Sequence, residues 1–103
     1  MSYTLIMTWD IKPDMEQEYY EFVIREWVPV TNKLGLQMVA AWYTQYSLHH
    51  SVPLIRAEGI AQDLGTMRTI LNSESWHEIH VKLMDYVENY SHKVVETTGD
   101  FRL

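Results

Sequence analysis

The sequence of 103 residues predicts an α+β fold with the element order β-α-β-β-α-β. Two observations predict it. Several stretches alternate apolar and polar residues with the period of a half-buried strand, and two longer stretches repeat apolar residues with the period of a helix. A chain of this length forms one domain, residues 1–103, and buries about two thirds of the surface that its unfolded form exposes.

The first strand is expected at residues 2–11, because alternate positions there are strongly apolar: Tyr3, Leu5, Met7, Trp9 and Ile11. A helix should follow as far as Trp27, with the Asp14 side chain accepting a hydrogen bond from the backbone three residues on. Pro29 removes a backbone donor and clashes with the preceding turn, which predicts a kink or break just before it. Gly35 suits the left-handed position that ends a helix.

The second strand is expected at residues 36–47, LQMVAAWYTQYS, which are rich in β-branched and aromatic residues. The third strand is expected at residues 54–62. One of its faces carries mainly small residues, which allow another segment to approach closely: Ile55, Ala57, Gly59 and Ala61. A short helix should follow Asp63.

A long second helix should begin at a serine cap, Ser73 or Ser75, and run to about Tyr90, with the final strand at residues 92–99. This order is that of the ferredoxin-like fold, in which both helices cover one face of a four-stranded antiparallel sheet. The other face has no helix over it, and the first two strands place apolar or small residues at several positions on either side. An uncovered apolar face indicates a partner, so we expect a two-fold homodimer whose sheets pack face to face.

Composition and charge exclude several classes of partner and site. The net charge is −6, and the eight basic residues are scattered singly, so no nucleic acid is expected to bind. The absence of cysteine excludes disulfides and thiolate metal sites. The first residues lack a basic targeting region, and no apolar run approaches the roughly 20 residues that span a bilayer. We therefore expect a soluble cytoplasmic protein that does not bind a membrane.

Five segments carry a resemblance that extends over nearly the whole chain: TWDIKPD, EWVPVTNKLG, LQMVAAWYT, SESWHE and HKVVETTGDF. They resemble the dimeric α/β-barrel superfamily, which includes antibiotic-biosynthesis-monooxygenase and NIPSNAP-like proteins. The resemblance implies a homodimer of ferredoxin-like subunits. Members of the superfamily include cofactor-free oxygenases of polycyclic phenols, haem-degrading enzymes, lactone isomerases and proteins without an assigned activity, so the fold does not choose among these functions.

His77 and His80 stand three residues apart in the second predicted helix. On a helical wheel, His80 lies at the edge of the apolar stripe that contains Trp76, whereas His77 lies towards the polar face. Helical zinc sites prefer two histidines four residues apart, and no third ligand can be placed. The favoured interpretation is a boundary histidine bonded to a neighbour or to water. A metal or haem ligand, and an acid or base in a pocket, are the alternatives for His80.

The haem-degrading branch of the resembling superfamily uses an asparagine on the first strand, with a tryptophan and a histidine from the region of the second helix. In this sequence Met7 occupies the position that matches the asparagine, and Trp76 and His80 are too close together for the pattern. Haem degradation is therefore disfavoured, and we expect no metal and no cofactor.

Glu26 falls inside the apolar arc of the first predicted helix. A carboxylate buried there without a partner would be made more basic by desolvation, which is one way to produce a general base. With Arg56 as a partner it would form an internal ion pair, and a kink at Pro29 would instead turn it towards solvent. Our hypothesis is that Glu26 is at least half buried.

Aromatic residues supply the walls that a flat apolar ligand needs, although core packing is the more common role of such residues. The candidates on the strands are Trp9, Trp42, Tyr43 and Tyr46. Arg56 and Glu58 share a strand face and should pair with neighbours or across the two-fold axis, because burying either one alone is costly. His49 and His50 are expected in a solvated loop.

The sequence thus predicts a small homodimer that holds a small, largely apolar molecule between its sheet and its helices. The candidate ligand-binding residues are Trp9, Trp42, Tyr43, Arg56 and Trp76, and the candidate catalytic residues are Glu26 and His80. One alternative is a cofactor-independent monooxygenase in which a buried base deprotonates an aromatic substrate. Another is a non-catalytic structural or regulatory dimer with a filled interior.

Overall fold

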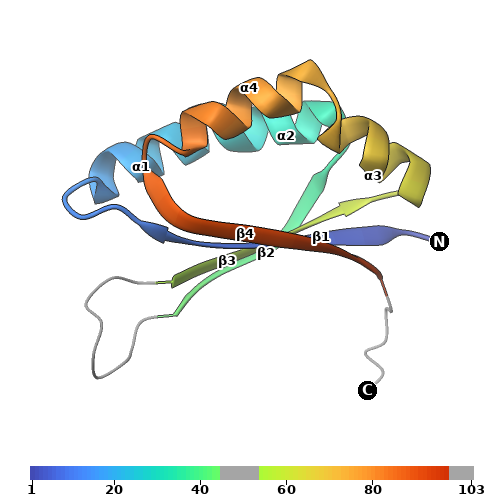
Figure 1. The fold of residues 1–103 in the computed structure, drawn as a ribbon, viewed down its shortest axis with the longest axis horizontal. Helices are drawn as coiled ribbons and strands as arrows, with labels where there is room; N and C mark the ends of the chain where they lie inside the picture. Colours follow the sequence, from blue (N-terminus) through green and yellow to red (C-terminus); the bar gives the residue numbers. More distant parts are fainter. Residues whose placement is uncertain (45–53, 98–103) are drawn as a thin grey trace.

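The computed structural model describes residues 1–44 and 54–97, except for the side chains of residues 40–44 and 54. Its elements are the strands β1 (Tyr3–Ile11), β2 (Gln37–Thr44), β3 (Leu54–Ala61) and β4 (Val87–Glu96), the α-helices α1 (Glu16–Phe22), α2 (Val28–Leu34), α3 (Leu64–Leu71) and α4 (Glu74–Leu83), and the π-helix η1 (Val23–Trp27). The strands form one antiparallel sheet in the order β2-β3-β1-β4, and the helices lie along one of its faces (Figure 1). The predicted ferredoxin-like α+β fold is confirmed.

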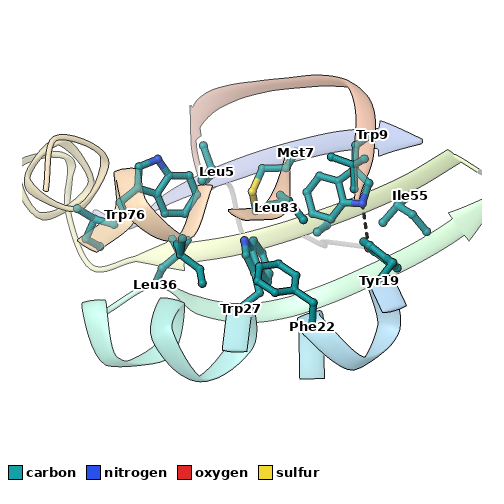
Figure 2. Packing of buried hydrophobic residues seen from close by; sticks show 14 of the residues in the cluster. Leu5, Met7, Trp9, Tyr19, Phe22, Trp27, Leu36, Ile55, Trp76 and Leu83 are labelled. Atoms are coloured by element: carbon teal, nitrogen blue, oxygen red, sulfur yellow. Dashed lines mark hydrogen bonds between the residues drawn. The ribbon is translucent and has the colours of Figure 1, made fainter. Parts of the chain in front are cut away.

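The central strand β1 directs its strongly apolar face towards the helices. Leu5, Met7, Trp9 and Ile11 are each at most 1% exposed and form the middle of the hydrophobic core. Figure 2 shows this layer packed against Trp27 and Phe22 from the helical side. The period-two pattern of the first strand therefore identified the buried face of the sheet correctly.

Strand β3 confirms the close approach expected from its small residues. A Cβ atom added to Gly59 would lie 2.8 Å from Cγ of Leu36, a side chain that is 0% exposed. Glycine is required here because Leu36 occupies the space that any larger side chain would fill.

The first helical run is continuous from Glu16 to Leu34 but contains the irregularity expected from Pro29. The backbone N–H of Val28 donates to the carbonyl of Val23, so a π-turn directly precedes the proline and accommodates its ring without a break. The run ends at Gly35 with φ of 102°, as predicted. The predicted cap at Asp14 is wrong, because this residue lies in a turn with φ of 65° and the helix begins without a side-chain cap.

The boundary between the second helix and the last strand differs from the prediction. Ser73 caps α4 as expected, its hydroxyl accepting from the N–H of Trp76 at 3.1 Å. The helix ends at Leu83 rather than near Tyr90, and β4 begins at Val87 rather than at residue 92. Tyr90 therefore belongs to a strand and contacts the core from the sheet.

The described part of the helix-free face is mainly polar. The strand register places these residues on that face: Thr4, Ile6 and Thr8 of β1, Arg56, Glu58 and Ile60 of β3, and Ser91, Lys93 and Val95 of β4. Of these, only Ile6, Ile60 and Val95 are apolar. On these three strands the largest apolar side chains turn towards the helices. The expectation of a broadly apolar uncovered face also concerns Ala40 and Trp42 of β2, whose side chains lie outside the described part, so it stays a prediction. Within the described residues, no helix has the length and hydropathy needed to cross a membrane.

Candidate functional site

A cluster of aromatic and imidazole rings lies between α4 and the edge strand β4. Trp76 and His80 come from α4, Tyr90 and His92 from β4, and Trp9 from β1; we call these five residues the His80 cluster. The imidazole of His80 stacks on Trp76 with 5.8 Å between ring centroids and meets Tyr90 edge to face at 4.6 Å. Tyr90 stacks in turn on Trp9, with centroids 5.8 Å apart and an interplanar angle of 13°. The rings therefore form one continuous set of contacts.

Local geometry on two elements positions these rings. Trp76 and His80 are four residues apart in α4, so they lie one above the other on the same helix face. In β4 the register passes from Thr8–Ser91 to Asp10–Glu88, which leaves Asn89 and Tyr90 together opposite Trp9. This bulge, with Asn89 at φ of 58°, places Tyr90 against the Trp9 ring.

His80 is the polar group of the cluster with an unusual environment. Its Nδ1 atom is buried and has no hydrogen-bond partner among the described residues. Burial lowers the pKa of His80 below 6.5, and the nearby His92 and His77 lower it further. The imidazole is consequently neutral near pH 7, and one ring nitrogen carries a lone pair that can accept a proton or a hydrogen bond.

Tyr90 and His92 form the side of the cluster nearest to solvent. The Tyr90 hydroxyl lies 2.9 Å from Nδ1 of His92, and the His92 side chain is exposed. Burial raises the pKa of Tyr90 well above its usual value, so the phenol stays protonated and is able to donate to this nitrogen.

Trp9 connects the cluster to the packed core. Its indole Nε1 donates to the Tyr19 hydroxyl at 2.8 Å, a bond drawn in Figure 2. Burial raises the pKa of Tyr19 to about 12, opposed by this hydrogen bond. Trp27 packs edge to face on Trp9 at 5.8 Å, and its buried Nε1 has no partner within the described part of the chain. Packed side chains therefore fill the region between β1 and the first helical run.

Glu26 is half exposed and has a charged partner. Its side chain is 49% exposed, and its carboxylate pairs with Nζ of Lys82 on α4 at 3.1 Å. The partner is therefore not Arg56, and the residue lies on the outside of the helical layer. About half of the Glu26 side chain is buried, in line with our hypothesis, but the carboxylate has Lys82 as a partner, so the burial without a partner that favours a general base is not observed. A catalytic role of Glu26 stays a prediction.

Arg56 lies away from the His80 cluster, on the helix-free face of the central strand β3. Its guanidinium bonds to the Glu58 carboxylate at 3.0 Å, so these two residues pair with each other, whereas we expected each to pair with a neighbour or across a two-fold axis. In the strand register Trp42 is opposite Arg56 and Tyr43 is opposite Ile55, while the side chains of both aromatic residues lie outside the described part of the structure. The predictions for Tyr46, His49 and His50 also fall outside it.

The described surface grooves lie on the outside of the helices, not beneath them. A groove of about 290 Å³ between α2 and α4 is lined by Arg25, Glu26, Pro29, Val30, Ser75, Glu78, Ile79 and Lys82. A second one of about 210 Å³ adjoins it at Arg25 and Glu26. Among residues 1–44 and 54–97, no three His, Asp or Glu side chains are grouped so that they could hold a metal ion.

Of the predicted site residues, the structure brings together Trp9, Trp76 and His80. Sequence reasoning missed Tyr90 and His92 because it assigned the first to a helix. Tyr90, His92 and Val94 alternate along β4 and all face the helices. This period-two pattern is the feature of the sequence that could have assigned Tyr90 and His92 to one strand face. His77 is exposed on α4, in agreement with its predicted position towards the polar face.

No family model matches the chain, and no curated protein matches it. Solved structures do. A NIPSNAP family protein from Agrobacterium tumefaciens superposes with a TM-score of 0.69 at 12% identity, over 100% of this chain and 99% of that one. SnoaB, a cofactor-independent oxygenase from Streptomyces nogalater solved as a mutant, gives a TM-score of 0.67 at 11% identity, over 99% and 98% of the two chains. The chain therefore shares the ferredoxin-like α+β fold of these structures.

A further match is an ethyl tert-butyl ether d (ethd) family protein from Bacillus halodurans, with a TM-score of 0.66 at 17% identity over 94% of this chain and 99% of that one. The resemblance to the dimeric α/β-barrel superfamily is thereby confirmed at the level of fold. At such identities the comparisons establish architecture alone, so a function for this chain has to be argued from its own residues.

Proposed function

We propose that this protein binds a small, flat, largely apolar molecule at the His80 cluster, with the His80 imidazole as the polar anchor. The observation that carries the proposal is the buried Nδ1 atom of His80, which has no partner among the described residues although it lies between two aromatic rings. A buried polar atom without a partner costs about 1–3 kcal/mol, and a ligand hydroxyl at hydrogen-bond distance would recover much of that.

The surrounding rings favour an uncharged ligand. Trp76 and Tyr90 pack directly on two sides of His80, so a ligand would bind by adding a flat apolar ring to this set of contacts beside one polar anchor. The same burial that keeps Tyr90 protonated and His80 neutral would disfavour a charged group beside them. A neutral phenol or a similar hydroxylated aromatic compound fits these requirements.

Titration with 1-naphthol and with naphthalene tests the proposal, because the two compounds differ only by the hydroxyl group. Wild-type protein should bind 1-naphthol about 5- to 150-fold more tightly, the equivalent of the 1–3 kcal/mol above. His80→Phe keeps a ring in place and should remove this preference. His77→Phe, on the exposed side of α4, serves as the matched control and should retain it. Equal affinity of the wild type for both compounds, or no binding of either, would contradict the proposal.

A second candidate function is cofactor-independent oxygenation of such a phenol. Two observations favour it: the fold is shared with SnoaB, a cofactor-independent oxygenase, and the neutral imidazole of His80 is able to take the proton of a bound phenol. The resulting electron-rich anion would react with dioxygen without a metal or a cofactor. Oxygen consumption with a naphthohydroquinone should then be lost in His80→Ala and retained in Glu26→Gln.

We also propose that the protein is a homodimer in solution, joined through the helix-free face of the sheet. Three partly exposed apolar residues on that face, Ile6, Ile60 and Val95, support it, and the polar groups around them can form bonds across a two-fold axis. Sedimentation equilibrium at low micromolar concentration tests it: a mass of twice 12.2 kDa is expected, and a stable single subunit would contradict it.

A further inference from the structure

We propose that Trp27, Trp9 and Tyr90 form a path that carries an oxidising equivalent from the buried core to the edge of the sheet, where His92 accepts the proton that Tyr90 loses. The path would allow a radical produced in the interior, by a one-electron oxidant or by light, to leave the core before it damages the fold. Ring geometry and hydrogen bonding define the path, which is independent of the proposed ligand and of the proposed oxygenase chemistry.

The rings of the path are in contact at every step. Trp27 and Trp9 are 2% and 1% exposed, and their ring centroids are 5.8 Å apart. Trp9 stacks on Tyr90 at 5.8 Å with nearly parallel planes, and Tyr90 reaches the exposed His92. Electron exchange between aromatic rings at van der Waals contact is fast, because the orbitals of the two π-systems overlap.

The step at Tyr90 requires a proton acceptor, and His92 provides it. A phenol that loses an electron becomes strongly acidic, so its oxidation is feasible only if the proton leaves at the same time. When an oxidised Trp9 takes one electron from Tyr90, the phenolic proton moves along the 2.9 Å hydrogen bond to Nδ1 of His92. The products are a restored Trp9, a neutral tyrosyl radical and an imidazolium ion, so one electron and one proton are accounted for.

Tyr19 also touches Trp9 but lacks this arrangement. Its hydroxyl accepts the hydrogen bond of the Trp9 indole, and no described imidazole or carboxylate accepts the proton of Tyr19. The radical is therefore directed to Tyr90, at the edge of the sheet, and not to Tyr19 in the core. Because burial keeps Tyr90 protonated until it is oxidised, proton and electron leave together.

Laser photoionisation of the tryptophans, with an electron scavenger present, tests the path. A tryptophanyl radical should decay in the wild type while a tyrosyl radical grows at the same rate, at a speed independent of protein concentration. Tyr90→Phe keeps the stacked ring and should abolish this concerted growth. His92→Phe leaves Tyr90 in place but removes the proton acceptor, and it should also abolish it.

Two matched controls make the test specific. Tyr19→Phe removes the other tyrosine in contact with Trp9, and His77→Phe removes a histidine of α4 that is not bonded to Tyr90. Both should retain the tyrosyl growth, and far-UV circular dichroism should show that every variant is folded. Unchanged growth in Tyr90→Phe, or its loss in Tyr19→Phe, would overturn the proposed path.

Discussion

Replacing His80 with phenylalanine distinguishes a structural role of this histidine from a binding role. The Nδ1 atom is buried without a described partner, so its removal relieves a desolvation cost of about 1–3 kcal/mol. Phenylalanine keeps an aromatic ring between Trp76 and Tyr90, and the partial exposure of position 80 leaves room for a slightly larger ring. The free energy of unfolding should therefore rise by about 1 kcal/mol, at the lower end of that range.

The same substitution should change how stability depends on pH. Burial, assisted by His92 and His77, lowers the pKa of His80 in the folded state below the 6.5 expected in the unfolded chain. Between these two values the unfolded chain binds more protons, so the folded state loses stability as the pH falls below about 6.5. His80→Phe lacks this loss, and its advantage over the wild type should be larger at about pH 5 than at about pH 7.5.

Urea denaturation followed by circular dichroism at the two pH values measures both effects, with His77→Phe as the control. A loss of about 1 kcal/mol or more in His80→Phe at neutral pH would show that Nδ1 is satisfied in the native protein. In that case the reasoning that makes His80 a polar anchor for a ligand would fail.

Five further substitutions, grouped in three tests, examine the fold and the position of Glu26. Gly59→Ala places a methyl group 2.8 Å from Leu36 and should lower the free energy of unfolding by about 1–3 kcal/mol. Gly65→Ala meets no atom closer than 3.5 Å, so it should leave the free energy of unfolding unchanged or raise it by up to about 1 kcal/mol. Similar urea midpoints for the two variants would refute this packing. Asn89 has φ of 58°, so Asn89→Ala should be about 1 kcal/mol less stable than Asn89→Gly, and equal stability of the two would count against the bulge. Glu26→Gln removes only the half-exposed ion pair with Lys82, so the free energy of unfolding should change by less than about 1 kcal/mol. The affinity for 1-naphthol should be unchanged. A clear loss of affinity would show that Glu26 contributes to ligand binding.

Features set by local chemistry could be predicted from the sequence. The alternation of Leu5, Met7 and Trp9 identified the buried face of β1, because side chains in a strand point to opposite faces in turn. Gly35 and Ser73 marked helix ends because each relieves a local steric or hydrogen-bonding constraint. These signals need no knowledge of the rest of the molecule.

The sequence left the position of Glu26 open between the apolar arc and solvent, because the helix changes its period there. A wheel drawn at roughly 100° per residue puts this carboxylate in the apolar arc. The π-turn of Val23–Trp27 has more residues per turn, so it rotates the following residues relative to that wheel. As a result Trp27 enters the core and Glu26 faces Lys82 on the outside.

The partners of His80 were missed for a different reason. Residues 84–90 continue the apolar stripe of α4 in the sequence, yet in the structure this stretch turns and enters β4 through a bulge opposite Trp9. Pairing with β1 is a contact between segments far apart in the chain, and it overrides the local helical pattern. Tyr90 and His92 reach His80 only through that pairing, so the site could be predicted only in part.

Nitrogen NMR of the histidine side chains during titration with 1-naphthol tests the central claim most directly. The account predicts that the ring nitrogens of His80 shift and saturate with 1-naphthol, that naphthalene leaves Nδ1 of His80 nearly unchanged, and that His77 responds to neither. A 1-naphthol titration that leaves His80 unchanged while the protein still binds the compound elsewhere would contradict the claim.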